Sequence, residues 1–261
     1  MTIKLWENEI PHNTETLTTV PYLTPFMVEG AKVCVIICPG GGYEHLCRDK
    51  EGEWLAEAFN KNGISAYVLE YRIKPYHNPA MLEDVTRAVR VARREAKTYG
   101  YDEDKIAVMG FSAGGHLASM SVTHFDYGKD GDETDAISSR PDMGILCYPV
   151  ITMDDFTHHG SRYNLLGDRW QDEEARLEFS SEKQVREDTP PCFIFHTAAD
   201  TCVPVANAMV MATGLVAKKI PCELHIFPTP DHGMGMGHTP DAMHAAQWFP
   251  LCVNAIRNWL K

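Results

Sequence analysis

The sequence predicts an α/β fold: a mostly parallel, doubly wound sheet with helices on both faces. Apolar runs alternate with helical patterns from about residue 33 to the end of the chain. The runs are apolar throughout rather than at every other position, which is typical of strands buried on both faces. Each helical pattern falls between two such runs, as the crossover connections of a parallel sheet require.

The first predicted elements have clear start and stop signals. The strand over residues 32–38, KVCVIIC, stops at Pro39 and three glycines. Residues 52–63 have helical spacing and end at a glycine, and residues 64–71 form a β-branched and aromatic strand. The pattern at 79–100 is a long amphipathic helix that begins at a proline and ends at a glycine.

The alternation continues through the rest of the chain. An apolar strand over residues 105–110 leads through a turn at Ser112 into a helix over 113–124. The polar stretch 152–189 is predicted to be an excursion from the sheet that could form part of a small cap. The remaining predicted strands are 143–150, 191–198 and 222–227, and the remaining predicted helices are about 204–219 and 240–260.

The composition is that of one globular domain. The chain has 261 residues, of which 44% are apolar and 23% are charged, enough to bury a sizeable core. No internal repeat or low-complexity linker divides it, so we expect residues 1–261 to form a single domain. The formal net charge of −12 argues against nucleic acid or an anionic membrane as a partner, because both need a basic face.

Targeting and cysteine signals favour a reduced, cytoplasmic protein. The N-terminal residues contain no apolar stretch of signal-peptide length, and no segment approaches the roughly 18 apolar residues of a membrane span. No CxxC pair is present, which argues against a zinc knuckle or a thioredoxin-type site. Four of the eight cysteines lie in apolar runs and are predicted to be small core residues: Cys34, Cys38, Cys147 and Cys192.

The segment VMGFSAGG over residues 108–115 places Ser112 between Gly110 and Gly114. A sharp turn from a strand into a helix brings strand and helix too close for a Cβ, and glycine at these two positions removes the clash. Such a turn presents the serine Oγ at the carboxyl end of the sheet, above a helix N-terminus. The alternative interpretation is an ordinary helix N-cap, which needs no partners.

A nucleophilic serine needs a base, and the base needs a carboxylate that orients it. Asp200 lies in the loop after the predicted strand 191–198, and His232 lies in the loop after the predicted strand 222–227. Doubly wound sheets hold their chemistry at the carboxyl ends of the strands. We therefore predict a triad of Ser112, Asp200 and His232, in the chain order of the doubly wound hydrolases.

Other residues are alternatives for these roles. Asp154 and Asp155 follow a predicted strand and could supply the carboxylate. His238 and His244 are alternatives for the base, although His244 falls in a predicted helix. No carboxylate–histidine spacing in this region matches a metal-binding helix, so no metal or cofactor is expected. His116 and His225 are expected to be structural.

The motif CPGGGY over residues 38–43 supplies candidate donors for an oxyanion. When a serine attacks a carbonyl, negative charge develops on the oxygen and must meet preorganised donors. The backbone N–H groups of Gly41 and Gly42 are predicted to be these donors, together with that of Ala113 directly after the serine. The alternatives are a flexible turn and a phosphate cradle, but neither a P-loop lysine nor GxGxxG spacing is present.

Segment by segment, the sequence resembles the carbohydrate acetylesterases of the α/β-hydrolase superfamily. The similar motifs are CPGGGY, GISAYVLEYR, KIAVMGFSAGGHLA, RPDMGILCYPV, TPPCFIFHTAADTCVPV and PDHGMGM. This branch contains acetylxylan esterases and bifunctional feruloyl and acetyl xylan esterases, and the resemblance runs from about residue 30 to the C-terminus. It implies Ser112 as the nucleophile, Asp200 as the acid and His232 as the base, with oxyanion donors in the PGGGY loop and at Ala113.

The resemblance also bears on the substrate. Pro39 stands where the hormone-sensitive-lipase relatives have histidine, which argues against assignment to those lipases. The expected lack of a secretion signal favours imported acetylated oligosaccharides over polymeric xylan. Tyr43, His45 and Trp170 are weak candidates for the substrate face, because each could equally pack in the fold. Trp170 could stack on a sugar ring or anchor the cap.

The predicted function is a serine carboxylic-ester hydrolase that removes small acyl groups, acetyl above all, from sugars or xylo-oligosaccharides through an acyl-enzyme intermediate. The alternatives are a peptidase, an amidase or a general short-chain carboxylesterase of the same fold, and a non-catalytic binding protein of hydrolase descent. The full set of triad elements argues against the last of these. The expected partner is a small-molecule or oligosaccharide ester, and the sequence indicates neither the sugar nor the oligomeric state.

Overall fold

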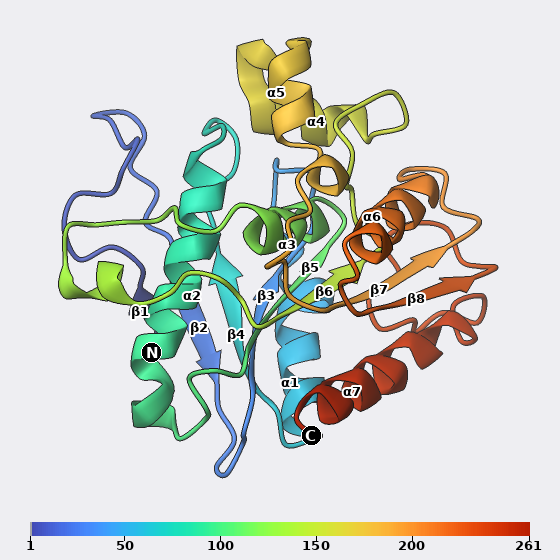
Figure 1. Ribbon diagram of the computed structural model, residues 1–261, viewed down its shortest axis with the longest axis horizontal. Coiled ribbons are helices and arrows are strands. Elements are labelled where there is room, and N and C mark those ends of the chain that lie inside the picture. Colours follow the sequence, from blue (N-terminus) through green and yellow to red (C-terminus); the bar gives the residue numbers. More distant parts are fainter. Residues whose placement is uncertain (1) are drawn as a thin grey trace.

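The computed structural model describes residues 2–261 and confirms the predicted fold class (Figure 1). The strands are β1 (Ile3–Lys4), β2 (Tyr22–Phe26), β3 (Cys34–Cys38), β4 (Ser65–Glu70), β5 (Ile106–Phe111), β6 (Met143–Cys147), β7 (Cys192–Thr197) and β8 (Cys222–Phe227). They form one eight-stranded sheet in the order β1-β2-β4-β3-β5-β6-β7-β8. Strands β3 to β8 pair in parallel, whereas β2 pairs antiparallel with both β1 and β4.

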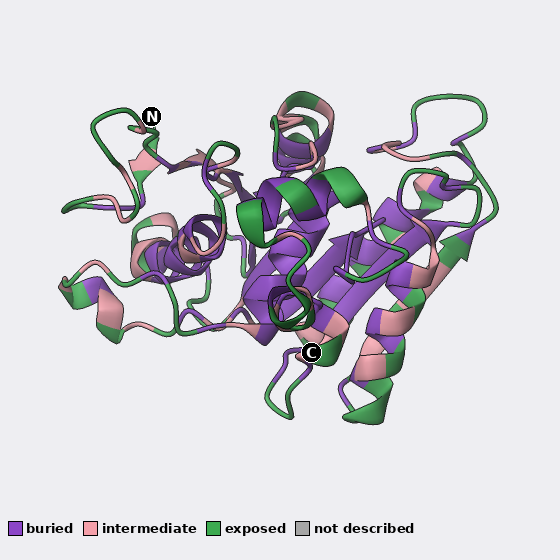
Figure 2. Ribbon diagram, turned by 90° about the horizontal axis from the view of Figure 1, so that it is seen from above, coloured by how far each residue is buried: buried purple, intermediate pink, exposed green. Residues whose placement is uncertain are grey.

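Helices cover both faces of this sheet. They are α1 (Trp54–Asn60), α2 (Ala80–Tyr99), α3 (Ala113–Thr123), α4 (His159–Leu166), α5 (Glu173–Glu178), α6 (Ala206–Ala217) and α7 (Trp248–Trp259). Side chains of α2, α3 and α6 belong to one buried cluster, and side chains of α1 and α7 belong to the other. The alternation along β3 shows the two layers, because Cys34 and Ile36 point into the first cluster while Val35 and Ile37 point into the second. Figure 2 shows the central strands buried between these layers.

The N-terminal strands were not predicted from the sequence. Strand β1 has two residues, and β2 is half-buried and contains Pro25. Strand β1 pairs only with Tyr22 and Leu23, so Pro25 has no partner on that side of β2. A short, partly exposed strand that contains proline is typical of a sheet edge and lacks the continuous apolar run of the central strands.

The start of the last helix was predicted wrongly. We expected it near residue 240, whereas α7 begins at Trp248 after a short 3₁₀ turn over Ala245–Gln247. None of the helices within residues 2–261 combines the length and the apolar character that crossing a membrane would require. All eight cysteines carry free thiols.

The segment 152–189 leaves the sheet between β6 and β7 and contains α4 and α5, which project beyond α3 in Figure 1. The side-chain amide of Asn164 on α4 donates a hydrogen bond to the carbonyl oxygen of Gly42 at 2.9 Å. The excursion therefore braces the glycine loop that follows β3. Its role as a cap stays a prediction.

Candidate active site

Ser112 lies at the sharp turn between β5 and α3, with φ of 54° and ψ of −118°. Residues other than glycine rarely adopt a positive φ, so the turn holds the serine in a strained backbone conformation. A Cβ on Gly110 would overlap the carbonyl oxygen of Gly114, and a Cβ on Gly114 would overlap the carbonyl oxygen of Cys38. The two glycines are thus required by close backbone contacts on both sides of the serine.

The structure brings the three residues of the predicted triad together. Nε2 of His232 lies 2.8 Å from Oγ of Ser112, and Nδ1 of His232 lies 2.6 Å from Oδ2 of Asp200. The three side chains follow β5, β7 and β8, so the carboxyl ends of three parallel strands supply them. A base within hydrogen-bond distance of the hydroxyl and a carboxylate behind the base form the arrangement that activates a serine.

The carboxylate of Asp200 has several hydrogen-bond donors. Oδ1 accepts from the N–H groups of Cys202 at 3.0 Å and Val203 at 2.7 Å, and Oδ2 lies 3.2 Å from Nε2 of His196. Burial would raise the pKa of Asp200, but the hydrogen bonds from His196 and His232 outweigh burial and hold this pKa well below its usual range. The group therefore stays ionised and can stabilise a positive charge on His232.

The glycine loop lies against the serine. A Cβ on Gly40 would stand 3.1 Å from the Cβ of Ser112. Among the hydrogen bonds within residues 2–261, the backbone N–H groups of Gly41, Gly42 and Ala113 have no acceptor. These are the three predicted oxyanion donors, and such donors must be free to bind a developing negative charge. Their role stays a prediction.

A buried hydrogen-bond chain connects the glycine loop with the loop that carries His232. Glu51 accepts from the N–H of Gly40 at 3.0 Å with one carboxylate oxygen and from the hydroxyl of Tyr148 at 2.7 Å with the other. The hydroxyl of Tyr148 accepts in turn from the N–H of Gly235 at 3.0 Å. Its ring lies edge-on to the imidazole of His232, with 5.1 Å between centroids. Sequence analysis missed both Glu51 and Tyr148.

His158, also missed, lies beside the glycine loop at the start of α4. Its Nδ1 accepts from the N–H of Ser161 at 3.2 Å and so caps the helix. Its Cε1 would lie 3.9 Å from a Cβ on Gly42. Burial, and then the charges of His232 and His159, lower the pKa of His158. Because Nδ1 is an acceptor, the neutral ring carries its proton on Nε2.

The predicted substrate-contacting residues have different surroundings. The prediction for Tyr43 was wrong, because its side chain is fully buried and its hydroxyl lies 2.9 Å from Nδ1 of His116. With φ of 59°, the backbone of Tyr43 takes a left-handed turn and the ring packs in the core rather than in the loop surface. Trp170 packs with Arg162, whose guanidinium lies 5.4 Å from its ring. His45 is exposed, and contact of His45 or Trp170 with a substrate stays a prediction.

The alternative acid and base residues have other contacts. Asp154 pairs with Arg176 rather than with a histidine of the site. His244 packs edge-on against Phe227, with 5.6 Å between ring centroids. His116 is fully buried, and burial lowers its pKa to about 4, as expected for a structural histidine.

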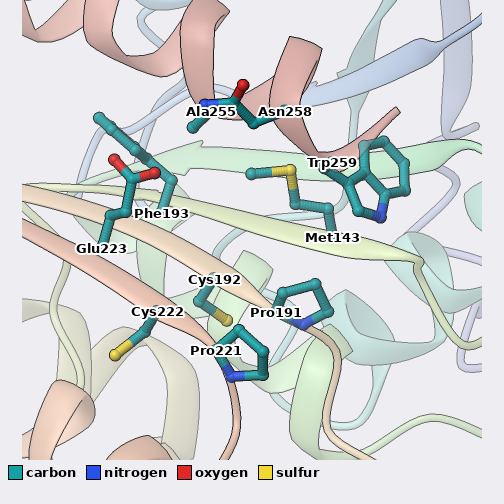
Figure 3. Close-up of a pocket in the computed structure, with 10 residues that line it drawn as sticks. All are labelled: Met143, Pro191, Cys192, Phe193, Pro221, Cys222, Glu223, Ala255, Asn258 and Trp259. Carbon is teal, nitrogen blue, oxygen red and sulfur yellow. The ribbon is translucent and has the colours of Figure 1, made fainter. Parts of the chain in front are cut away.

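A pocket of about 310 Å³ lies at the end of the sheet where the parallel strands begin, away from the carboxyl ends that carry the predicted triad (Figure 3). Met143, Cys192 and Cys222, the first residues of β6, β7 and β8, line it together with Trp259 from α7. The predicted triad instead follows the carboxyl ends of the strands. This pocket is therefore separate from the candidate active site.

A protein-family model and two named proteins match this chain in sequence. A protein-family model described as BD-FAE matches residues 22–215. Endo-1,4-beta-xylanase B of Butyrivibrio fibrisolvens is 45% identical over 207 residues, which are 77% of this chain and 32% of that protein. An acetylxylan esterase of Xylanibacter ruminicola is 32% identical over 234 residues, which are 87% of this chain and 45% of that protein. The chain thus spans less than half the length of either relative.

A solved structure matches nearly the whole chain. It is the crystal structure of an acetyl ester-xyloside bifunctional hydrolase from Caldicellulosiruptor lactoaceticus, with a TM-score of 0.93 and 41% sequence identity. The match covers 99% of this chain and 96% of that one.

Proposed function

The chain belongs to the BD-FAE family of α/β-hydrolase esterases, and from this premise we propose that it is a serine esterase that removes acetyl groups from sugars or xylo-oligosaccharides. The observation that carries the proposal is the continuous hydrogen-bond relay from Ser112 through His232 to Asp200. The names of the relatives support the acetyl group and the xylan-derived alcohol.

In the first half of the proposed reaction, Oγ of Ser112 attacks the ester carbonyl carbon while Nε2 of His232 takes the hydroxyl proton. Asp200 accepts a hydrogen bond from Nδ1–H and stabilises the imidazolium. The N–H of Gly41 or Gly42 and that of Ala113 bind the oxyanion. The bond between the carbonyl carbon and the alcohol oxygen then breaks, and His232 gives its proton to the leaving sugar hydroxyl.

In the second half, a water molecule attacks the acetyl group on Ser112 and gives a proton to His232. The acyl–enzyme bond breaks, acetate leaves, and the serine oxygen regains its proton from His232. These steps call for no metal or cofactor. We also propose that the segment 152–189 borders the site, since Asn164 contacts the glycine loop and His158 lies beside it.

The test is acetate release from acetylated xylo-oligosaccharides by the wild type and by Ser112→Ala. We expect release by the wild type and a loss of at least about a thousandfold in the variant. Hydrolysis of p-nitrophenyl acetate without release from the oligosaccharides would reject the sugar substrate and keep the esterase. Cleavage of an aminoacyl p-nitroanilide in preference to both esters would favour a peptidase, and full activity of Ser112→Ala would reject the nucleophile.

A further inference from the structure

A pocket of about 390 Å³ opens beside His232, between the start of α1 and the loop after β8. This volume lies within the range of about 300–1,000 Å³ that small-molecule sites occupy. The loop is held against α1 because Nζ of Lys50 donates a hydrogen bond to the carbonyl oxygen of Gly233 at 3.1 Å. The lining residues that matter to its chemistry are Lys50, Trp54, Asp231, His232, His238 and Asp241.

The indole of Trp54 is the one aromatic hydrocarbon surface among the pocket's apolar lining residues, which also include Pro230, Met234 and Met236. The Trp54 side chain is 49% exposed, although a tryptophan is usually largely buried. The ring of His238 lies edge-on to it, with 6.1 Å between centroids and 69° between planes, and so restricts its orientation. Core packing does not explain why a tryptophan stands at position 54, because half of its surface is exposed. The exposed ring is available to a ligand.

The rim of the pocket is polar. His238, Thr239 and Asp241 are exposed, and their side chains offer donors and acceptors around the indole. Asp231 has a different role, because its carboxylate accepts from the N–H groups of Thr201 and His232 and fixes the loop. A flat apolar surface with hydrogen-bonding groups at its edge matches a pyranose ring, which has C–H groups on its faces and hydroxyls around its circumference.

The direction of proton transfer indicates which part of the ester occupies this pocket. In the proposed reaction, His232 gives its proton to the alcohol oxygen, so the alcohol must leave from beside His232. The carbonyl oxygen must instead face the N–H groups of the glycine loop and of Ala113. His232 lines the pocket, whereas the glycine loop and Ala113 do not, so the pocket lies on the side of the alcohol rather than of the carbonyl oxygen.

We propose that Trp54 forms a binding subsite for the pyranose ring of the leaving alcohol. The indole stacks on one face of the sugar, and the rim of His238, Thr239 and Asp241 binds its hydroxyls. This inference rests on the proposed function, because it assumes that His232 protonates a sugar hydroxyl. It adds a residue that distinguishes sugar esters from esters of small alcohols.

The test compares acetylated xylo-oligosaccharides with ethyl acetate, whose alcohol is too small to reach an aromatic platform. For Trp54→Ala we expect kcat/KM on the oligosaccharides to fall at least about tenfold further than kcat/KM on ethyl acetate. Trp54→Phe should restore part of the difference, because it keeps an aromatic face. Tyr127→Ala is the matched control: Tyr127 is 37% exposed and lies outside both the pocket and the segment 152–189, so both substrates should react as with the wild type.

A binding measurement separates the subsite from catalysis. In the Ser112→Ala background, deacetylated xylotriose should quench tryptophan fluorescence, and adding Trp54→Phe should remove most of that quenching. Equal losses on both esters, with xylotriose quenching unchanged, would overturn the subsite. A larger loss on a feruloyl ester of ethanol than on the acetylated sugar would instead assign Trp54 to an aromatic acyl group. Failure of the wild type on the sugar esters, with ethyl acetate still hydrolysed, would reject the sugar substrate itself.

Discussion

The hydroxyl of Tyr148 donates a hydrogen bond to Glu51 at 2.7 Å, and both side chains are buried. Through this pair, the N–H of Gly40 is connected with the N–H of Gly235. The first belongs to the loop of the predicted oxyanion donors, and the second follows the predicted base by three residues. Catalytic groups must be held within about 0.5 Å of their productive positions, so the pair sets the spacing of the two loops.

Tyr148→Phe removes the hydroxyl and leaves an oxygen of Glu51 and the N–H of Gly235 without their partner. We expect the free energy of unfolding in urea to fall by about 1–3 kcal/mol, the typical effect of leaving a buried polar group unsatisfied. We also expect kcat on p-nitrophenyl acetate to fall about tenfold with little change in KM, because small displacements of catalytic groups slow the chemical step. A destabilised variant with wild-type kcat would limit the pair to a structural role.

Asp200→Asn keeps the shape of the side chain but removes its charge. We expect kcat on p-nitrophenyl acetate to fall about 10³–10⁴-fold, because the amide can hold the imidazole in the wrong tautomer and cannot stabilise the imidazolium. Asp154→Asn is the control, since that carboxylate pairs with Arg176 outside the triad. If Asp154→Asn lost more activity than Asp200→Asn, the assignment of the acid would be wrong.

Gly110→Ala tests the turn that carries the nucleophile. A Cβ at this position would overlap backbone atoms of Gly114 and Gly115, so we expect a loss of more than about 3 kcal/mol of stability, or failure to fold. Gly63→Ala is the comparison, because its Cβ would meet open space and only its φ of 75° opposes a side chain. That variant should lose about 1–2 kcal/mol. Equal urea midpoints for the two variants would contradict the steric argument.

His116 contributes to the pH dependence of stability in the same direction as His124 and His158, because burial lowers the pKa of all three. Burial lowers the pKa of the His116 imidazole from 6.5 to about 4. Between these values the unfolded chain takes up a proton that the folded chain does not, so stability is full above pH 6.5 and falls as the pH decreases towards 4. The loss approaches about 3 kcal/mol. The lowered pKa of Asp200 acts only at still lower pH, below the carboxyl's ordinary value of 3.8.

Urea unfolding measured at steps of pH from 7 to 4 checks this prediction. His116→Gln cannot titrate in this range, so its curve should be flatter than that of the wild type, whatever its stability at pH 7. Parallel curves for the two proteins would show that other groups cause the acid destabilisation.

The sequence was informative where side chains are buried on two faces. Strands β3 to β7 are nearly continuous apolar runs, and each was predicted to within a few residues. The partly exposed edge strand β8, with the sequence CELHIF, was predicted at its observed bounds from its alternating apolar residues. Strands β1 and β2 pack at the edge of the sheet and are partly exposed, so burial leaves little pattern in their sequence. The start of α7 was missed because the apolar pattern does not distinguish a 3₁₀ turn from a first helical turn.

Motifs located the predicted triad, but they did not locate the residues that connect its loops. Glu51 lies in the polar run CRDKEGEW, which resembles a solvated helix start, and Tyr148 follows an apolar strand like any core aromatic. Their roles depend on a contact between residues 97 positions apart. Tyr43 was misjudged for a related reason, because only the three-dimensional structure shows that its ring turns away from the glycine loop.

The hydrogen bond between Ser112 and His232 joins residues 120 positions apart. During synthesis from the N-terminus, the strand, turn and helix around the serine are made long before the loop after β8 leaves the ribosome. A nascent chain that ends before His232 has the predicted nucleophile but lacks the predicted base. By the proposed mechanism, hydrolytic competence therefore arises late in biogenesis, and its recovery on refolding would report the docking of the last strand rather than the initial collapse of the sheet.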